Sequence, residues 1–213
     1  MRLTKYGHSC VRIEQDGAVL VIDPGAFTDG RQAALDGVDA VLITHEHLDH
    51  LDPDTLADAL GKRPSVTVHT HPAVLSKLDA VSDVVTTVES GDAFTAGGMA
   101  IRAYGGWHAE IHPEIPRVPN LGFLVADSIY HPGDSFDVPE GATVDTLFVP
   151  VSAPWLKLSE SVEFVRAVAP RRAFALHDAL LSDAGGTVTD ANMSKLARCD
   201  YDRLVPGTSV DGG

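Results

Sequence analysis

Short runs of β-forming residues fill the first part of the chain. Between positions 10 and 14, the apolar residues Val11 and Ile13 alternate with charged ones, as they do in a strand with one buried face. The dipeptide Asp16-Gly17 that follows favours a tight turn. The pattern therefore predicts an antiparallel meander of strands at 3–6, 10–14 and 19–22.

Strands and helices alternate after this meander. Residues 40–43 are continuously apolar, as expected for a strand that is covered on both faces. Asp52 and Pro53 favour the start of a helix that ends at Gly61. Further helices are predicted at 72–78, 159–168 (with Ser159 as its N-cap) and 190–197, and further strands at 66–69, 84–88, 100–104, 122–126, 129–130, 146–149 and 172–176. Such alternation is typical of an α/β fold.

Three histidines and an aspartate follow the strand at 40–43, in the segment Thr44-His45-Glu46-His47-Leu48-Asp49-His50. If the chain leaves the strand still extended, His45 and His47 project to the same side and can bind one metal ion. Asp49 and His50, on the following turn, can reach a second ion. A helix would turn residues two apart to different faces, and the spacing is not that of helical zinc proteases. The alternative, a solvated loop with fortuitous histidines, fits poorly between an apolar strand and a capped helix.

Four motifs of this chain resemble those of one known family. They are the HxHxDH signature at 45–50, Tyr6-Gly7-His8-Ser9-Cys10 with Val21-Ile22-Asp23-Pro24-Gly25, Tyr130-His131-Pro132-Gly133-Asp134-Ser135, and Phe174-Ala175-Leu176-His177. Their order and spacing resemble the metallo-β-lactamase superfamily, and within it the small metal-dependent hydrolases that include L-ascorbate-6-phosphate lactonase-like proteins. The resemblance covers most of the chain.

The resemblance implies a four-layer αββα sandwich of mixed sheets, as a single domain over residues 1–213, with a dinuclear metal site at one edge of the two sheets. One ion would be bound by His45, His47 and His108, the other by Asp49, His50 and His177, and Asp134 would bridge the two. His112 lies in the same long loop, residues 105–119, and could replace His108 as a ligand. His108 is favoured because it follows the preceding strand more closely.

The remaining histidines and Asp23 have more ordinary interpretations. His69 and His71 flank a strand end and a helix start, where polar residues are common. His131 is expected to orient the Asp134 loop, and Asp23 to shape the backbone near the metals. His8 has two equally favoured interpretations: ordinary packing, or a role in supporting a metal ligand or contacting substrate.

Composition narrows the classes of partner. With 213 residues and 44% hydrophobic content, the chain can bury one core with little left for a second domain. A net charge of -14 argues against nucleic-acid binding, which depends on Lys and Arg. Two distant cysteines make a disulfide framework improbable, and the absence of a long apolar run predicts a cytoplasmic protein without membrane association.

These features predict a hydrolase that acts on a small-molecule substrate. Imidazole and carboxylate ligands without thiolate suit Zn²⁺ first, with Mn²⁺ or Fe possible. A hydroxide bridging two such ions would attack an ester, lactone or phosphoester, with Asp49 and Asp134 holding the ions and His112 protonating the leaving group. The 150–158 loop, with Trp155, either walls the pocket or packs on the next helix. Two alternatives are a di-iron redox module of the same fold and a non-enzymatic metal-binding scaffold.

Overall fold

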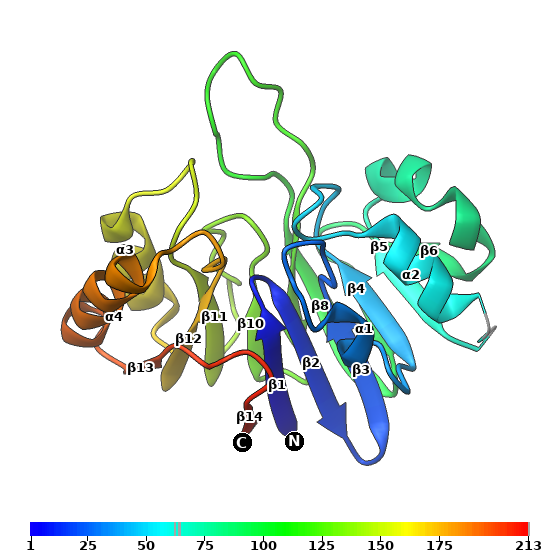
Figure 1. Cartoon of the computed structure of the whole chain (residues 1–213), viewed down its shortest axis with the longest axis horizontal. Helices are drawn as coiled ribbons and strands as arrows, with labels where there is room; N and C mark the ends of the chain where they lie inside the picture. Colours follow the sequence, from blue (N-terminus) through cyan, green and yellow to red (C-terminus); the bar gives the residue numbers. More distant parts are fainter. Residues whose placement is uncertain (62, 64, 213) are drawn as a thin grey trace.

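Two seven-stranded sheets form the body of the protein in a computed structural model that describes residues 1–61, 63 and 65–212 (Figure 1). In the first sheet the strand order is β14 (Ser209–Asp211), β1 (Arg2–Gly7), β2 (Cys10–Gln15), β3 (Ala18–Ile22), β4 (Ala40–Ile43), β5 (Thr67–Thr70) and β6 (Val85–Thr87). The meander β1–β3 is antiparallel, as predicted, and β3 to β6 are parallel.

The second sheet is arranged in the same way as the first. Its strand order is β13 (Asp200–Asp202), β12 (Arg172–Leu176), β11 (Thr146–Pro150), β10 (Ile129–His131), β9 (Leu121–Val125), β8 (Met99–Gly105) and β7 (Ala93–Ala96). The pairs from β7 to β10 are antiparallel, and those from β10 to β13 are parallel. Both sheets are therefore mixed, which confirms the prediction.

Apolar side chains from the inner faces of the two sheets form one continuous core, in which Leu20 and Leu42 of the first sheet join Phe123 and Phe148 of the second. Two further cores lie on the outer faces. One is covered by α1 (Arg31–Ala34), α2 (Pro53–Leu60) and the 3₁₀ helices η1 (Pro72–Lys77) and η2 (Asp79–Val84), the other by α3 (Leu158–Val168) and α4 (Asp183–Leu196). The result is the predicted four-layer αββα sandwich in a single domain (Figure 1).

Two helix starts differ from the sequence prediction. The N-cap of α3 is Lys157 rather than Ser159, because Glu160 reaches back to accept a hydrogen bond from the Lys157 amide at 2.6 Å. Helix α4 begins at Asp183 rather than 190, after Ser182, whose side chain accepts a hydrogen bond from the Gly185 amide. The edge strands β7, β13 and β14, together with α1 and η2, were not predicted; all are short. No helix in the described ranges is long and apolar enough to cross a bilayer.

The strand directions bring the predicted site together. Because β1, β3 and β4 run the same way in one sheet, their carboxyl ends share an edge, and the same holds for β8, β10 and β12 in the other. The segments that leave these six ends carry His8, Asp23, His45, His108, Asp134 and His177. The long β8–β9 connection projects from the body as a separate arm (Figure 1).

Candidate metal centre

Two groups of four side chains could each hold a metal ion at this edge. The first group is His45, His47, His108 and Asp134, and the second is His8, Asp49, His50 and His177. In each group the candidate ligand atoms lie within 4.8 Å of one another. All seven ligands expected from the sequence are in these groups, and His8 is an additional member.

Distances within the groups suit coordination. The Nε2 atom of His45 is 3.1 Å from Nδ1 of His47, and Nε2 of His108 is 3.2 Å from Oδ2 of Asp134. In the second group, Nε2 of His177 is 3.1 Å from Oδ2 of Asp49. Two ligands about 2.0–2.1 Å from a tetrahedral zinc ion lie about 3.3 Å apart. The donor atoms are thus spaced as neighbouring ligands of one ion.

Asp134 lies between the two groups. Its Oδ1 atom is 3.0 Å from Nε2 of His50, and its Oδ2 atom is 3.2 Å from Nε2 of both His108 and His177. One carboxylate therefore contacts histidines of both groups. This is the position that a bridging ligand requires.

Several buried atoms of the site have no hydrogen-bond partner among the described residues. They include Nε2 of His50, His108 and His177 and Oδ1 of Asp134. Their neighbours are close enough for hydrogen bonds but are not aligned for them. Buried polar atoms without a partner are rare, and each one needs an explanation. One cation in each group would satisfy all four atoms, so the donor set fits metal ions.

Hydrogen bonds at Nδ1 determine where three of the histidines carry their proton. Nδ1 of His50 donates to Asp23 at 2.7 Å, Nδ1 of His108 to the Ala109 carbonyl at 2.5 Å, and Nδ1 of His177 to the Ser152 carbonyl at 2.6 Å. A neutral imidazole carries one proton, so Nε2 of each ring keeps its lone pair for the site. Such outer partners orient metal-binding histidines.

Asp23 performs the supporting role that the sequence suggested. It is fully buried, and besides His50 it accepts hydrogen bonds from the amide of Thr44 at 2.8 Å and the hydroxyl of Thr44 at 2.7 Å. Because the Thr44 hydroxyl proton points to Asp23, its oxygen is free to accept from Nδ1 of His45 at 2.9 Å. One carboxylate therefore orients two predicted ligands.

Comparison with known proteins agrees with this geometry. The family model described as "Beta-lactamase superfamily domain" matches residues 2–177. The chain belongs to the beta-lactamase superfamily. It is 37% identical to Protein Rv0786c of Mycobacterium tuberculosis over 99% of each chain, and 30% identical to a UPF0173 metal-dependent hydrolase of Chelativorans sp. over 70% of each. The metallo-beta-lactamase fold protein YhfI from Bacillus subtilis superposes with a TM-score of 0.78, at 16% identity, over 99% of this chain and 98% of the other. The YhfI structure shows a shared fold, and the match to the UPF0173 relative identifies the chain as a metal-dependent hydrolase.

Burial and neighbouring charges together set the pKa values in this hydrolase. Burial alone would raise the pKa of Asp134, but His50 and His177 outweigh it and hold that pKa well below its usual range. Burial lowers the pKa of His177, whereas Asp134 and Asp49 raise it to about 9. Burial and the nearby positive charge of His50 keep the pKa of His45 well below its normal value. Binding a cation therefore displaces protons, chiefly from the second group.

The other histidines of the hydrolase lie outside both groups. His112 is exposed, and its Nδ1 atom accepts a hydrogen bond from the Glu114 amide at 3.2 Å, so the structure brings His108 and not His112 to the metal groups. His131 is buried and contacts the Gly133 amide in the Asp134 loop, consistent with the orienting role expected of it. His69 stacks on Phe94, and His71 accepts a hydrogen bond from the Ala73 amide.

One contact at the site was not expected from the sequence. The indole nitrogen of Trp155 donates to Oδ2 of Asp134 at 3.1 Å. Trp155 also lines a cavity of about 220 Å³ above the ligands, which agrees with the expectation that the 150–158 loop walls the pocket. Its role as a hydrogen-bond donor has no local sequence signature, because Asp134 is 21 positions away.

Proposed function

We propose that this hydrolase binds two divalent metal ions, one in each group, and cleaves an ester, lactone or phosphoester bond of a small molecule. The observation that carries the proposal is a set of buried atoms that have no hydrogen-bond partner among the described residues. They are Oδ1 of Asp134 and, around it, Nε2 of His108 from the first group and Nε2 of His50 and His177 from the second. Zn²⁺ is the favoured ion because the ligands are imidazoles and carboxylates, and Mn²⁺ and Fe remain candidates for the same reason.

The chemistry divides between the ions and the chain. Bound divalent ions lower the pKa of a coordinated water towards neutrality and polarise the bond to be cleaved. Asp134 and Asp49 supply the negative charge that holds two cations about one substrate-sized space. Trp155 keeps the Asp134 carboxylate in one orientation through its 3.1 Å hydrogen bond. His112 is the proposed proton donor to the leaving group, which requires the arm to bring this exposed histidine towards the cavity.

Metal analysis of the purified chain tests the proposal. We expect about two equivalents of zinc, manganese or iron per wild-type chain, and about one or fewer in Asp134→Ala. Glu46→Gln is the matched control, since Glu46 is a carboxylate of the same loop outside both groups, and it should bind as the wild type does. Iron with a visible absorption band and no hydrolysis would instead favour the redox module.

A hydrolase assay is the second test of the proposed function. A panel of lactones, thioesters, carboxylic esters and phosphodiesters is assayed with wild type, Asp49→Ala and His112→Ala. We expect Asp49→Ala to lose at least about a hundredfold in rate, because it removes a ligand that is also charged. Equal activity in wild type and Asp49→Ala would contradict the proposal, and an unchanged His112→Ala would remove only the proposed role of His112.

A further inference from the structure

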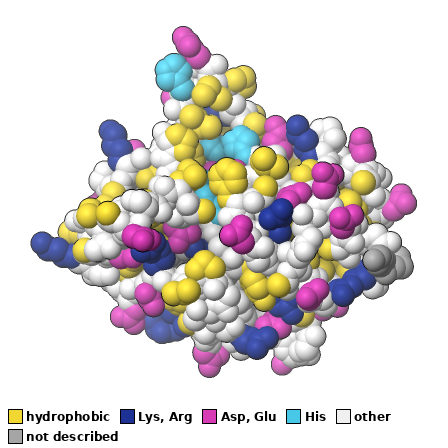
Figure 2. Space-filling view, viewed as in Figure 1, with side chains coloured by type: hydrophobic (Ala, Val, Ile, Leu, Met, Phe, Trp, Pro, Cys, Tyr) yellow, Lys and Arg dark blue, Asp and Glu magenta, His cyan; other side chains and the backbone are white. Residues whose placement is uncertain are grey.

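The cavity above the metal groups has apolar walls. Phe27, Ile111, Pro154, Trp155 and Leu180 line it, together with ligands at its base. In Figure 2, hydrophobic side chains surround the patch of histidines on the upper part of the visible face. The walls come from four separate loops, so their shared apolar character is not the consequence of one local run of sequence.

Two of these wall residues are unusually exposed for their size. Phe27 has 45% of its surface accessible and Leu180 has 58%. Large apolar side chains gathered in the open at a functional cleft mark binding surfaces, because a ligand that covers them removes their surface from water. A substrate with an apolar group would gain binding free energy at this place.

The same cavity lacks the groups that recognise phosphate. Neither Lys nor Arg is among the described residues that line it. Arg117 lies in a separate small pocket beside His47 and His108, and its Nε atom already donates to the His108 carbonyl at 2.7 Å. Sites for phosphate esters generally supply Arg, Lys or a helix N-terminus in addition to any metal.

We infer that the substrate is an uncharged carboxylic ester or lactone whose apolar portion packs on Phe27 and Leu180. This inference rests on the proposed function and selects among its bond types. Water adds to the carbonyl carbon and the acyl carbon–oxygen bond breaks. The acyl part leaves as a carboxylic acid, which ionises, and the alcohol oxygen takes up a proton; a lactone gives a single hydroxy acid.

A series of p-nitrophenyl esters from acetate to octanoate tests the inference, with p-nitrophenyl phosphate and its diester as the charged alternatives. We expect kcat/KM of the metal-loaded wild type to rise by up to about fourfold per added methylene, the limit set by full burial of each group. Both phosphate esters should be slower than the hexanoate by at least about a hundredfold. Leu180→Ala and Phe27→Ala should flatten the series, so that the ratio of the octanoate to the acetate rate falls in each variant.

Val205→Ala is the matched control, because Val205 is a strongly exposed apolar residue outside the cavity, and it should leave the whole series unchanged. Faster cleavage of a phosphate ester, or a flat series in the wild type, overturns this inference and leaves the proposed function standing. Hydrolysis of neither class by the metal-loaded protein overturns both.

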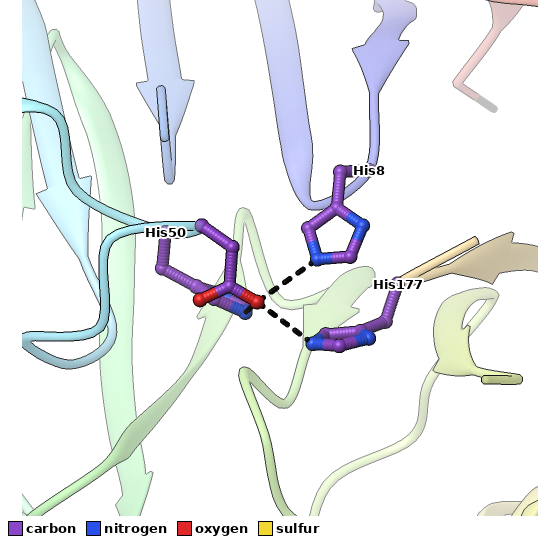
Figure 3. Close-up of side chains that lie close together, drawn as sticks. His8, His50 and His177 are labelled. Atoms are coloured by element: carbon purple, nitrogen blue, oxygen red, sulfur yellow. Dashed lines mark hydrogen bonds and ion pairs between the residues drawn. The ribbon is translucent and has the colours of Figure 1, made fainter. Parts of the chain in front are cut away.

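A second inference comes from an independent observation, the hydrogen bonds of His8. This buried residue belongs to the second group by distance, but its ring is held differently from those of His50 and His177. Nδ1 of His8 faces the Ala179 amide at 3.3 Å, and Nε2 is 3.1 Å from Oδ2 of Asp49. Figure 3 shows the three rings around the carboxylate to which the His8 and His177 contacts run.

The Ala179 amide determines where the His8 proton lies. A backbone N–H can only donate, so Nδ1 of His8 must present its lone pair, and the single proton of the neutral ring is on Nε2. That proton points at Asp49. Nδ1 of His50 and of His177 face oxygens that can only accept, so in the neutral rings, from which a metal ion has displaced the second proton, Nε2 presents a lone pair. A metal ligand needs a lone pair, and Nε2 of His8 has none.

We propose that His8 is a positioning residue that donates to Asp49, and that it is not itself a metal ligand. Its backbone also accepts a hydrogen bond from the His177 amide at 3.0 Å. His8 therefore joins the turn after β1 to the segment after β12 and aligns Asp49 with His177. The second ion is then held by Asp49, His50, His177 and the shared Asp134.

Metal affinity of His8→Gln and His8→Ala tests this role, by competition with a zinc-binding dye. The glutamine amide can still donate to Asp49, so we expect His8→Gln to keep two ions within about threefold of wild-type affinity. His8→Ala removes the donor and should weaken one of the two ions by about 10–100-fold, the range for lost outer partners. Both variants share the backbone strain of the positive φ at this position, 35°, so the difference between them reports the side chain.

His177→Gln, which removes a ligand, is the reference for loss of an ion. The inference is wrong if His8→Gln loses an ion as His177→Gln does, since that is the behaviour of a ligand. It is also wrong if His8→Ala binds as the wild type does. In the zinc-loaded protein, ¹⁵N NMR should find the His8 proton on Nε2; a proton on Nδ1 overturns the assignment directly.

Discussion

At the scale of single residues, the site depends on donors that hold its carboxylates. Asp134 has its backbone amide bonded to the Asn120 side chain at 3.0 Å, and its Oδ2 atom accepts the indole proton of Trp155. A carboxylate shared between two metal groups would tolerate little rotation, because its oxygens already lie 3.0–3.2 Å from histidines of both groups. The donors around Asp134 therefore belong to the metal site as much as the ligands do.

Trp155→Phe isolates one of these donors. It removes the indole N–H and keeps an aromatic ring beside Phe136. We expect metal affinity to fall by about 10–100-fold, measured by competition with a chelator, with little change in the free energy of unfolding of the metal-free chain. Trp107→Phe is the control, since Trp107 is 55% exposed. Equal affinities in the two variants would contradict a role for the indole proton.

Gly25→Ala tests a close contact between backbones. A Cβ atom at Gly25 would overlap the backbone carbonyl oxygen and carbonyl carbon of Asp49. Backbone atoms cannot move aside as a flexible side chain can. We expect a loss of at least about 2–3 kcal/mol in the free energy of unfolding, measured with urea, and loss of metal from the second group. Gly106→Ala should change stability by less than about 1 kcal/mol, because a Cβ there meets nothing within 4 Å. Similar losses in both variants would refute this explanation.

At the scale of elements, a buried ion pair links the two sheets. Lys5 of β1 is fully buried, and its Nζ atom lies 2.5 Å from Oδ1 of Asp178, the second residue after β12. Burial lowers the pKa of Lys5 and Asp178 opposes this shift. Asp178 follows His177 in sequence, so the pair also restrains the segment that carries a metal ligand.

Lys5→Met leaves Asp178 with 11% exposure and no cation at its side. We expect a cost of about 3–5 kcal/mol in urea unfolding, most of which the double variant Lys5→Met/Asp178→Asn should recover, because the penalty comes from the unpaired charge. The control is Arg171→Met, which breaks an exposed pair with Asp145 and should cost less than about 1 kcal/mol. A double variant as unstable as Lys5→Met would contradict this reasoning.

Elements with a strong local pattern could be predicted from the sequence, and those set by tertiary contacts could not. The meander has alternating apolar residues, and the strand before His45 is a continuous apolar run. The first turns of α4 contain Gly185 and Gly186, which disfavour helix, so the local sequence does not predict that the helix begins at Asp183. The edge strands β13 and β14 have only three residues each, which is too short for a periodic signal.

The candidate site follows the same division. The seven expected ligands lie together because strand ends and motif spacing locate them. The role of His8 could not be read from the sequence, because it depends on the Ala179 amide, 171 positions away. The donor role of Trp155 likewise depends on how its loop folds back over the β10 end. Long-range hydrogen bonds leave no spacing for a sequence pattern to detect.

At the scale of the whole molecule, protons and metal ions compete for the same side chains of the folded protein. The pKa of His177 is raised to about 9 despite burial, so its contribution to stability is complete below its unfolded pKa of about 6.5 and is lost as pH rises towards 9. The pKa of Asp134 is depressed, so its contribution is complete above about pH 4 and is lost on acidification. The metal-free chain should therefore be most stable between about pH 4 and 6.5.

Bound zinc should reverse the loss of stability above about pH 6.5. In the metal-free chain the positive charge of protonated His177 offsets the negative charges of Asp134 and Asp49, and in the zinc-bound chain the ion offsets them. We expect the Tm of the chelator-treated protein to fall between about pH 6.5 and 8.5, and zinc to raise Tm most at the upper end, where fewer protons compete. Zinc at 100 times its Kd adds about 2.7 kcal/mol per site, or about 5–10 °C for a chain of this size. His177→Gln should flatten the metal-free profile over this interval. A zinc effect that is largest near about pH 5, where the histidine is protonated, would show that metal ions do not displace its proton.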